Sequence, residues 1–140
     1  MNVYLETSAA LRDLLDGDGA EAIRSVLESA EQVAASRLTI AEVERVFARL
    51  RSLEPAVAAR GAAREANFAA EADLWTIQPL DEDILRRCGR PFPVEPVRML
   101  DAVHLATIEK LSSALPHLVV LTTDERVRKN AVALGFDVQP

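Results

Sequence analysis

The feature that most constrains the fold of this chain is a continuous apolar run at residues 118–122, which reads Leu-Val-Val-Leu-Thr. A strand with one face in water alternates apolar and polar residues, and this run does not. It is therefore typical of a strand that is covered on both faces, as strands of parallel sheets are. A parallel sheet needs helices between its strands, so the run predicts a layered α/β domain.

The rest of the chain alternates between strand-like and helical patterns in the way that such a domain requires. We expect the strands at residues 2–6, 32–36, 75–77, 118–122 and 136–138. We expect the helices at residues 7–15, 20–30, 39–53, 55–74, 82–88, 97–115 and 124–134. Residues 89–96 contain three prolines, which predict an irregular loop. The predicted fold is a three-layer α/β/α sandwich with a mostly parallel five-stranded sheet.

Length, charge and composition narrow the class of protein. A chain of 140 residues is expected to form one domain, residues 1–140. A single cysteine, Cys88, excludes an internal disulfide and a cysteine-rich zinc site. The net charge of −6 argues against a broadly basic coat protein for nucleic acid. No apolar run is long enough for a signal core or a membrane span, so we expect a cytoplasmic protein with no membrane contact.

Four carboxylates stand at comparable places in this pattern. Glu6 ends the first strand, Glu42 lies in the first turn of the helix after the second strand, Asp101 lies near the start of the long helix, and Asp124 follows the fourth strand. Ligands of open α/β sheets bind beyond the carboxyl ends of the strands, so these four acids are expected to meet. Oxygen ligands of this kind suit Mg²⁺ or Mn²⁺.

Each acid, taken alone, also has a simpler interpretation. Thr39 and Glu42 have the spacing of a capping box, Asp124 suits an N-cap, and Asp101 suits the first turn of a helix. Glu6 is explained equally well as an exposed residue at a strand end. The set is harder to explain in this way, because clustered carboxylates repel one another unless a cation lies between them.

The order of the motifs resembles the PIN domain, and specifically the VapC-type toxins of bacterial toxin–antitoxin pairs. The matching segment with the most specific pattern is Leu-Asp-Ala-Val-His-Leu-Ala at residues 100–106. The others are residues 3–9, 36–43, 121–126 and 134–136, so the resemblance covers nearly the whole chain.

The resemblance implies an endoribonuclease that depends on Mg²⁺ or Mn²⁺ and hydrolyses RNA phosphodiester bonds with a metal-activated water. It also implies a homodimer, a cognate VapB-type antitoxin that blocks the site, and an RNA substrate, for which tRNA is one expectation. The residues carried over as catalytic and metal-binding are Glu6, Glu42, Asp101 and Asp124, with Ser8 and Thr122 as polar support.

The chain departs from the family pattern at Glu6, because the first motif usually carries aspartate. Glutamate is one methylene longer, and a Mg²⁺ site demands near-ideal octahedral geometry. The alternative function is therefore a catalytically weakened PIN domain that binds an antitoxin or RNA without efficient cleavage. A phosphoacceptor signalling domain shares the layer architecture, but the chain lacks a suitable lysine near the last strand and paired acids in the first loop.

Several other residues have more than one interpretation. His104 lies three residues after Asp101 on the same predicted helix face, and a structural role in the core is favoured over catalysis. Basic clusters at 45–49, 86–90 and 126–129 suit either RNA phosphates or a solvated helix face. The apolar helices within residues 20–74 are expected either to fill the core or to form a groove for an amphipathic partner segment.

Overall fold

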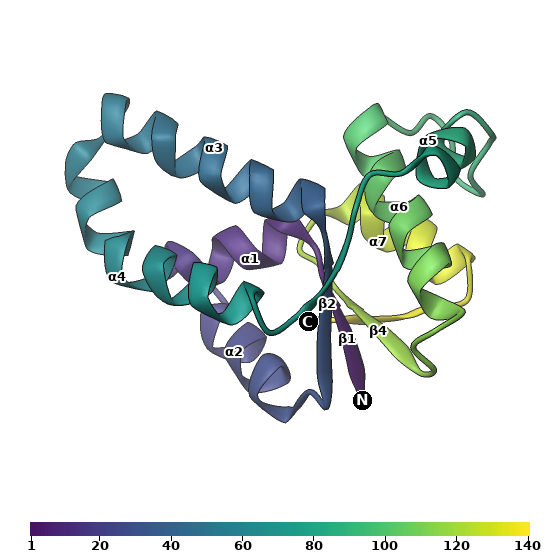
Figure 1. Ribbon diagram of the computed structural model, residues 1–140, viewed down its shortest axis with the longest axis horizontal. Coiled ribbons are helices and arrows are strands. Elements are labelled where there is room, and N and C mark those ends of the chain that lie inside the picture. Colours follow the sequence, from purple (N-terminus) through teal and green to yellow (C-terminus); the bar gives the residue numbers. More distant parts are fainter.

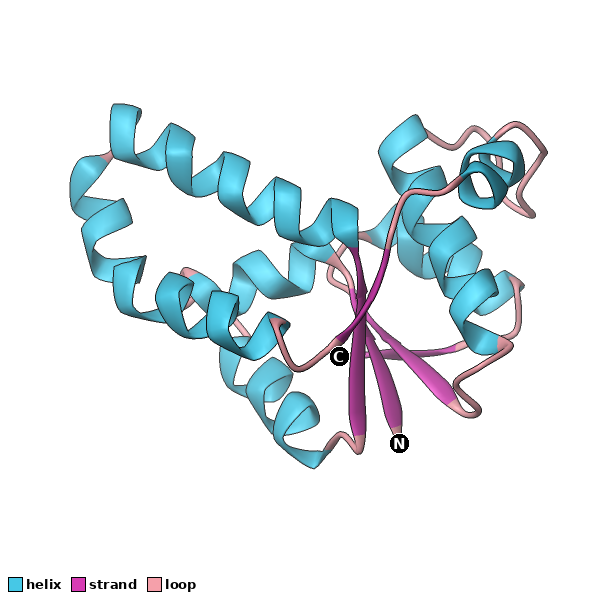
Figure 2. Ribbon diagram, viewed as in Figure 1, coloured by secondary structure: helices cyan, strands magenta, loops and turns pink.

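A computed structural model describes the whole chain, residues 1–140, around one five-stranded sheet. The strands are β1 (Asn2–Leu5), β2 (Gln32–Ser36), β3 (Thr76–Gln78), β4 (Leu118–Leu121) and β5 (Asp137–Gln139). Their order across the sheet is β3-β2-β1-β4-β5, and every neighbouring pair is parallel. Figure 2 shows the strands in the centre with helices on either side. The predicted parallel five-stranded sheet is confirmed.

Seven helices form the two outer layers. They are α1 (Thr7–Leu14), α2 (Ala20–Ser29), α3 (Arg37–Leu53), α4 (Pro55–Ala72), α5 (Glu82–Cys88), α6 (Met99–Ser112) and α7 (Glu125–Ala133). Figure 1 shows α1 to α4 on one side of the sheet and α5 to α7 on the other. This arrangement confirms the three-layer sandwich. None of the helices combines the length and apolar character that a membrane span requires.

The central strands supply side chains to two separate apolar cores. Val3 and Leu5 of β1 join the core under α1 to α4, whereas Tyr4 between them joins the core under α5 to α7. In β4, Val120 and Leu121 divide between the same two cores. All four residues of β4 are buried, which is the physical reason for the apolar run that predicted this strand.

The bounds of α3 and α6 differ from the expected ones, and a side-chain cap explains the start of α3. Helix α3 begins two residues earlier than predicted because the Ser36 hydroxyl accepts a hydrogen bond from the Leu38 backbone N–H at 3.1 Å. The expected capping box is wrong, since the Thr39 hydroxyl instead donates to the Leu5 carbonyl at 3.3 Å. Helix α6 is shorter than the predicted span of residues 97–115, with Arg98 as its N-cap residue and Ser113 as its C-cap residue.

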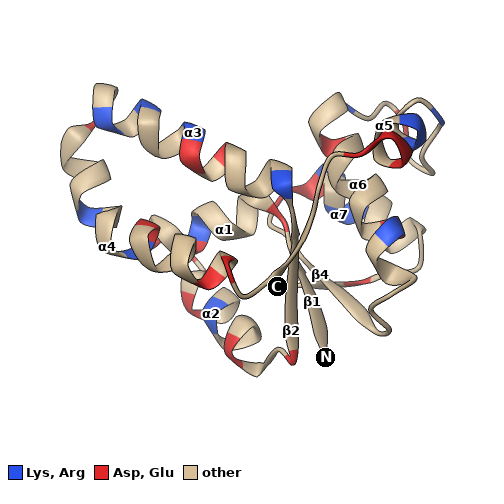
Figure 3. Ribbon diagram, in the orientation of Figure 1, with Lys and Arg blue, Asp and Glu red and all other residues tan.

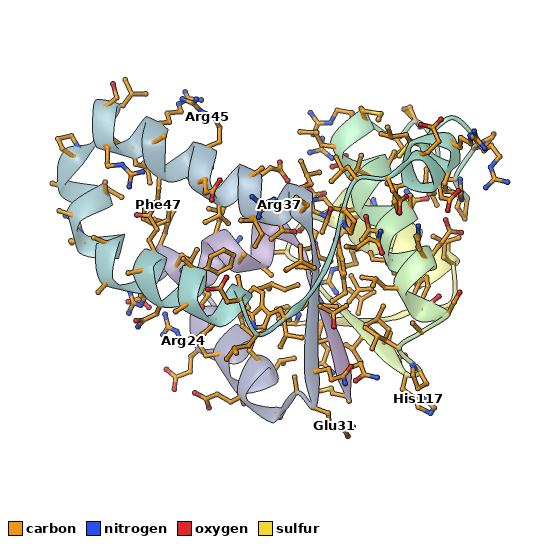
Figure 4. The ribbon with its side chains drawn as sticks, viewed as in Figure 1. Arg24, Glu31, Arg37, Arg45, Phe47 and His117 are labelled. Carbon is orange, nitrogen blue, oxygen red and sulfur yellow. The ribbon has the colours of Figure 1, made fainter.

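Helices α3 and α4 form a hairpin that extends beyond the sheet (Figure 1). The Phe47 side chain of α3 is fully buried and lies between the two helices (Figure 4). Its ring packs against Gly61 of α4 so closely that a Cβ at Gly61 would lie 2.9 Å from Phe47 Cε1. The close approach of the two helices therefore depends on glycine at position 61 and on the aromatic ring at position 47.

We expect Phe47→Ala to lower the free energy of unfolding by about 3–5 kcal/mol, because the buried ring leaves a cavity behind. Denaturant unfolding followed by circular dichroism measures this change. The matched control is Arg45→Ala, at an exposed position of the same helix (Figure 4), with an expected change within about 0.5 kcal/mol. Equal stability of the two variants would contradict the packing described for the hairpin.

Candidate active site

The four acids that the sequence analysis selected line one cavity of about 430 Å³. Glu6 directly follows β1, Glu42 lies in the second turn of α3, Asp101 lies in the first turn of α6, and Asp124 is the N-cap of α7. Figure 3 shows acidic positions in the middle of the molecule, where α1, α6 and α7 come together. The structure thus brings together side chains that are up to 118 residues apart in the chain.

Glu6 is buried, with an exposed fraction of 5%, so its interpretation as an exposed strand end is wrong. Its Oε2 accepts hydrogen bonds from the Ser8 backbone N–H at 3.0 Å, from the Ser8 hydroxyl, and from the Thr122 hydroxyl at 2.7 Å. The side chain therefore serves as the N-cap of α1. Three donors on one oxygen compensate for much of the cost of burying this carboxylate.

Ser8 and Thr122 join the carboxyl ends of β1 and β4. The Ser8 Oγ accepts hydrogen bonds from the backbone N–H groups of Thr123 at 2.9 Å and Asp124 at 3.0 Å. The Thr122 Oγ1 also accepts from the Asp124 N–H, at 3.1 Å. Through these contacts the Glu6 carboxylate fixes the loop that carries Asp124.

Glu42 is held by a second set of contacts, from Thr7 of α1 and from His104 of α6. Its Oε1 accepts a hydrogen bond from the Thr7 hydroxyl at 2.7 Å and lies 3.1 Å from His104 Nε2. His104 Nδ1 lies 2.8 Å from the Tyr4 hydroxyl. Because Nε2 faces a carboxylate, it carries the proton, and Nδ1 accepts a hydrogen bond from the Tyr4 phenol.

The pKa directions agree with this assignment. Burial, followed by the nearby Glu6 carboxylate, raises the pKa of Tyr4 well above its ordinary value, so the phenol stays protonated and able to donate. Burial also raises the pKa of Glu42, but the hydrogen bonds from His104 and Thr7 outweigh that effect and hold the pKa below its ordinary value. Glu42 is therefore a carboxylate at neutral pH.

The sequence analysis favoured a structural role for His104 and did not select Thr7 or Tyr4. In the structure the His104 ring lies in the core, where it is 2% exposed. Its Nε2 atom also contacts Glu42 in the cavity. Thr7 stands beside Glu6 in the first motif, which was the available signal. Nothing in the spacing of residues indicated Tyr4, because its partner lies 100 residues away.

Asp101 differs from the other acids because its Oδ2 is buried and has no hydrogen-bond partner. The closest cationic atoms are the Nε atoms of Arg126 at 3.6 Å and Arg98 at 3.8 Å. Burial, and after it the charge of Asp124, raises the pKa of Asp101 above its ordinary value. An unpaired buried oxygen of this kind is unusual and is available to a ligand.

Asp124 is both the N-cap of α7 and a residue of the cavity. Its Oδ1 accepts a hydrogen bond from the Arg126 backbone N–H at 2.8 Å, so it is the N-cap that the sequence suggested. Its Oδ2 lies 3.4 Å from Arg126 Nη2. The Arg126 guanidinium thus lies close to both Asp101 and Asp124.

The chemical type of the side chains that line the cavity fits a hard divalent cation. Four carboxylates line the cavity, and one of their oxygens is buried and unpaired. As arranged, however, no group of three or more acidic, histidine or cysteine side chains lies close enough together to hold a metal ion. Glu6 and Glu42 are turned toward their hydrogen-bond donors, so a cation that uses all four acids requires these side chains to rotate.

The parallel sheet with an acidic cavity at its carboxyl end defines the class to which the chain belongs. Residues 3–133 match the PIN domain. Ribonuclease VapC46 of Mycobacterium tuberculosis is 34% identical over 136 residues, which cover 97% of this chain and 95% of that protein. The chain therefore belongs to the PIN-domain family, as one of its VapC-type toxins.

Solved structures support the same fold at lower identity. FitAcB from Neisseria gonorrhoeae matches with a TM-score of 0.71 at 22% identity. The match covers 99% of this chain and 96% of the FitAcB chain. A chain of a toxin–antitoxin complex from Klebsiella pneumoniae matches with a TM-score of 0.61 at 17% identity. The match covers 100% of this chain and 97% of that chain. The PIN-like sandwich expected from the resemblance is thereby confirmed.

We expect Thr122→Val to lower the free energy of unfolding by about 1.5–3 kcal/mol, because it removes a hydrogen bond to the buried Glu6 carboxylate without changing the side-chain shape much. Thermal or denaturant unfolding at neutral pH measures the loss. Thr122→Ser keeps the hydroxyl and should retain most of the stability. If the valine variant is as stable as the wild type, the Thr122–Glu6 contact does not stabilise the site.

Proposed function

We propose that this protein is a divalent-metal-dependent endoribonuclease that forms the toxin of a toxin–antitoxin pair. The observation that carries the proposal is the meeting of Glu6, Glu42, Asp101 and Asp124 in one cavity, with Asp101 Oδ2 buried and unpaired. The relative VapC46 is named a ribonuclease, which supports the same reaction class. A phosphodiester in RNA is the substrate class.

In this proposal the four carboxylates hold the cation, and the remaining polar residues hold the carboxylates. Mg²⁺ or Mn²⁺, when bound, supplies positive charge to the phosphodiester and lowers the pKa of a water molecule. Ser8 and Thr122 restrain Glu6, while Thr7 and His104 keep Glu42 ionised. Tyr4 fixes the tautomer of His104 from the core.

A second function is favoured by the state of Glu6. Its Oε2 already accepts three hydrogen bonds, and its Oε1 lies 3.5 Å from His104 Nε2. A carboxylate restrained in this way is a poorer ligand than a free one. The second function is a weakened PIN domain that acts by binding its antitoxin or RNA.

The antitoxin is proposed to bind on the side of the sheet that carries α1, α2 and α4. A cavity of about 280 Å³ there is lined by apolar side chains that include Leu14, Leu27 and Trp75, together with acidic and basic side chains. Such a mixture suits an amphipathic segment that carries charged positions beside its apolar face. The Klebsiella pneumoniae structure is a toxin–antitoxin complex, which supports a partner of this kind. A homodimer, a cytoplasmic location and a single domain at residues 1–140 stay predictions.

We expect Asp101→Asn to reduce RNA cleavage at least about 100-fold, because a lost metal ligand costs several kcal/mol of transition-state stabilisation. The assay follows structured RNA, tRNA included, with Mn²⁺ or Mg²⁺ and with a chelator. Asp18→Asn, which changes an exposed acid outside the cavity, is the matched control and should cleave like the wild type. Cleavage that survives either the chelator or Asp101→Asn would rule out the proposed mechanism.

We expect Glu6→Asp to change the cleavage rate constant less than about tenfold, since Glu6 is proposed to be a working ligand. Single-turnover cleavage of the same RNA measures the effect. A gain of about 100-fold, the scale of a corrected misplacement of a catalytic group, would instead identify the natural protein as a weakened enzyme.

A further inference from the structure

Two arginines lie in an unusual place for their charge. Arg98 is the N-cap of α6, with no capping hydrogen bond from its side chain, and Arg126 is the second residue of α7. Helix N-termini favour acidic residues, because the helix macrodipole places positive charge there. Helix stability therefore does not explain either arginine.

Both arginines line the acidic cavity, and they are its only permanently charged cationic side chains. They are also well exposed, with 66% of the Arg98 side chain and 56% of the Arg126 side chain open to solvent. A guanidinium in this position has enough freedom to move between the carboxylates and a ligand in the cavity.

The contacts of Arg126 are close but weak. Its Nε lies 3.6 Å from Asp101 Oδ2, and its Nη2 lies 3.4 Å from Asp124 Oδ2. The first distance is too long for a hydrogen bond, and Asp101 Oδ2 remains unpaired. By contrast, Arg128 on the same helix donates to the carbonyls of Thr122 at 2.9 Å and Pro140 at 2.7 Å, as a structural residue does.

A polyanion that enters this cavity meets four carboxylates on a chain with a net charge of −6. A cation that binds Asp101 and Asp124 must in turn displace the Arg126 guanidinium. Arginine binds phosphate oxygens well because its planar fork matches their geometry. A movement of the Arg126 guanidinium from the two carboxylates to a phosphate group therefore frees the carboxylates for the cation and also attracts the RNA backbone.

We propose that Arg126, assisted by Arg98, is the phosphate-binding residue of the site. When RNA enters the cavity, the Arg126 guanidinium moves away from Asp101 and Asp124 and contacts a phosphodiester of the RNA. Until then Arg126 acts as the counterion of these two acids and competes with a divalent cation for them. This inference rests on the proposed function, and it adds the residue that recognises the substrate backbone.

Binding of a fluorescent RNA hairpin, measured by anisotropy in Ca²⁺ over a series of salt concentrations, tests the phosphate contact. We expect Arg126→Gln to weaken binding and to reduce the slope of log affinity against log salt by about 1. Arg126→Lys keeps the charge and should retain the slope. The matched control is Arg60→Gln, which removes a positive charge from an exposed residue of α4 outside the cavity and should leave the slope unchanged.

Binding of Mn²⁺ alone, followed by electron paramagnetic resonance, tests the competition. We expect Arg126→Gln to bind Mn²⁺ at least about twofold more tightly than the wild type, because a competing cation is gone. An Arg126→Gln variant with unchanged salt slope and unchanged Mn²⁺ affinity overturns the inference, even if the wild type cleaves RNA. A wild type that binds no Mn²⁺ overturns the proposed function and this inference together.

Discussion

The structure depends on the burial of the Glu6 carboxylate between the ends of β1 and β4. A buried charge is costly unless donors surround it, and Ser8 and Thr122 supply those donors. The same hydroxyls accept the backbone N–H groups of Thr123 and Asp124, so the charge of Glu6 also orders the start of α7. One buried acid thereby ties together two parallel strands and two helix starts, and these elements form one wall of the cavity.

On the opposite wall of the cavity, a second carboxylate, Glu42, is held in place through His104. Tyr4 comes from the core under α5 to α7, and its phenol sets the tautomer of His104. His104 and Thr7 then hold Glu42 ionised on α3. Asp101 is the exception, because no donor satisfies its Oδ2. The Asp101 Oδ2 atom is thus the carboxylate oxygen of the cavity that no hydrogen bond restrains.

The sequence was most informative where local chemistry decides the outcome. The apolar run of β4 and the N-cap at Asp124 follow from short-range patterns, and the structure confirms both. The convergence of the acids followed from the rule for parallel sheets. The contacts of Glu6 with Thr122, of Thr39 with Leu5 and of His104 with Tyr4 did not follow from spacing, because these partners lie 34 to 116 residues apart. Only the tertiary fold decides whether such a side chain caps a helix, faces solvent or joins a network.

The central claim is that four carboxylates from separate elements form one divalent-cation site. The most direct measurement is a crystal structure of the protein soaked in Mn²⁺, with anomalous diffraction data to locate the ion. We expect an anomalous peak in the cavity, at ligating distance from Asp101 Oδ2 and from at least two of Glu6, Glu42 and Asp124. Well-ordered crystals with no peak in the cavity, or with a peak only elsewhere, would contradict the claim.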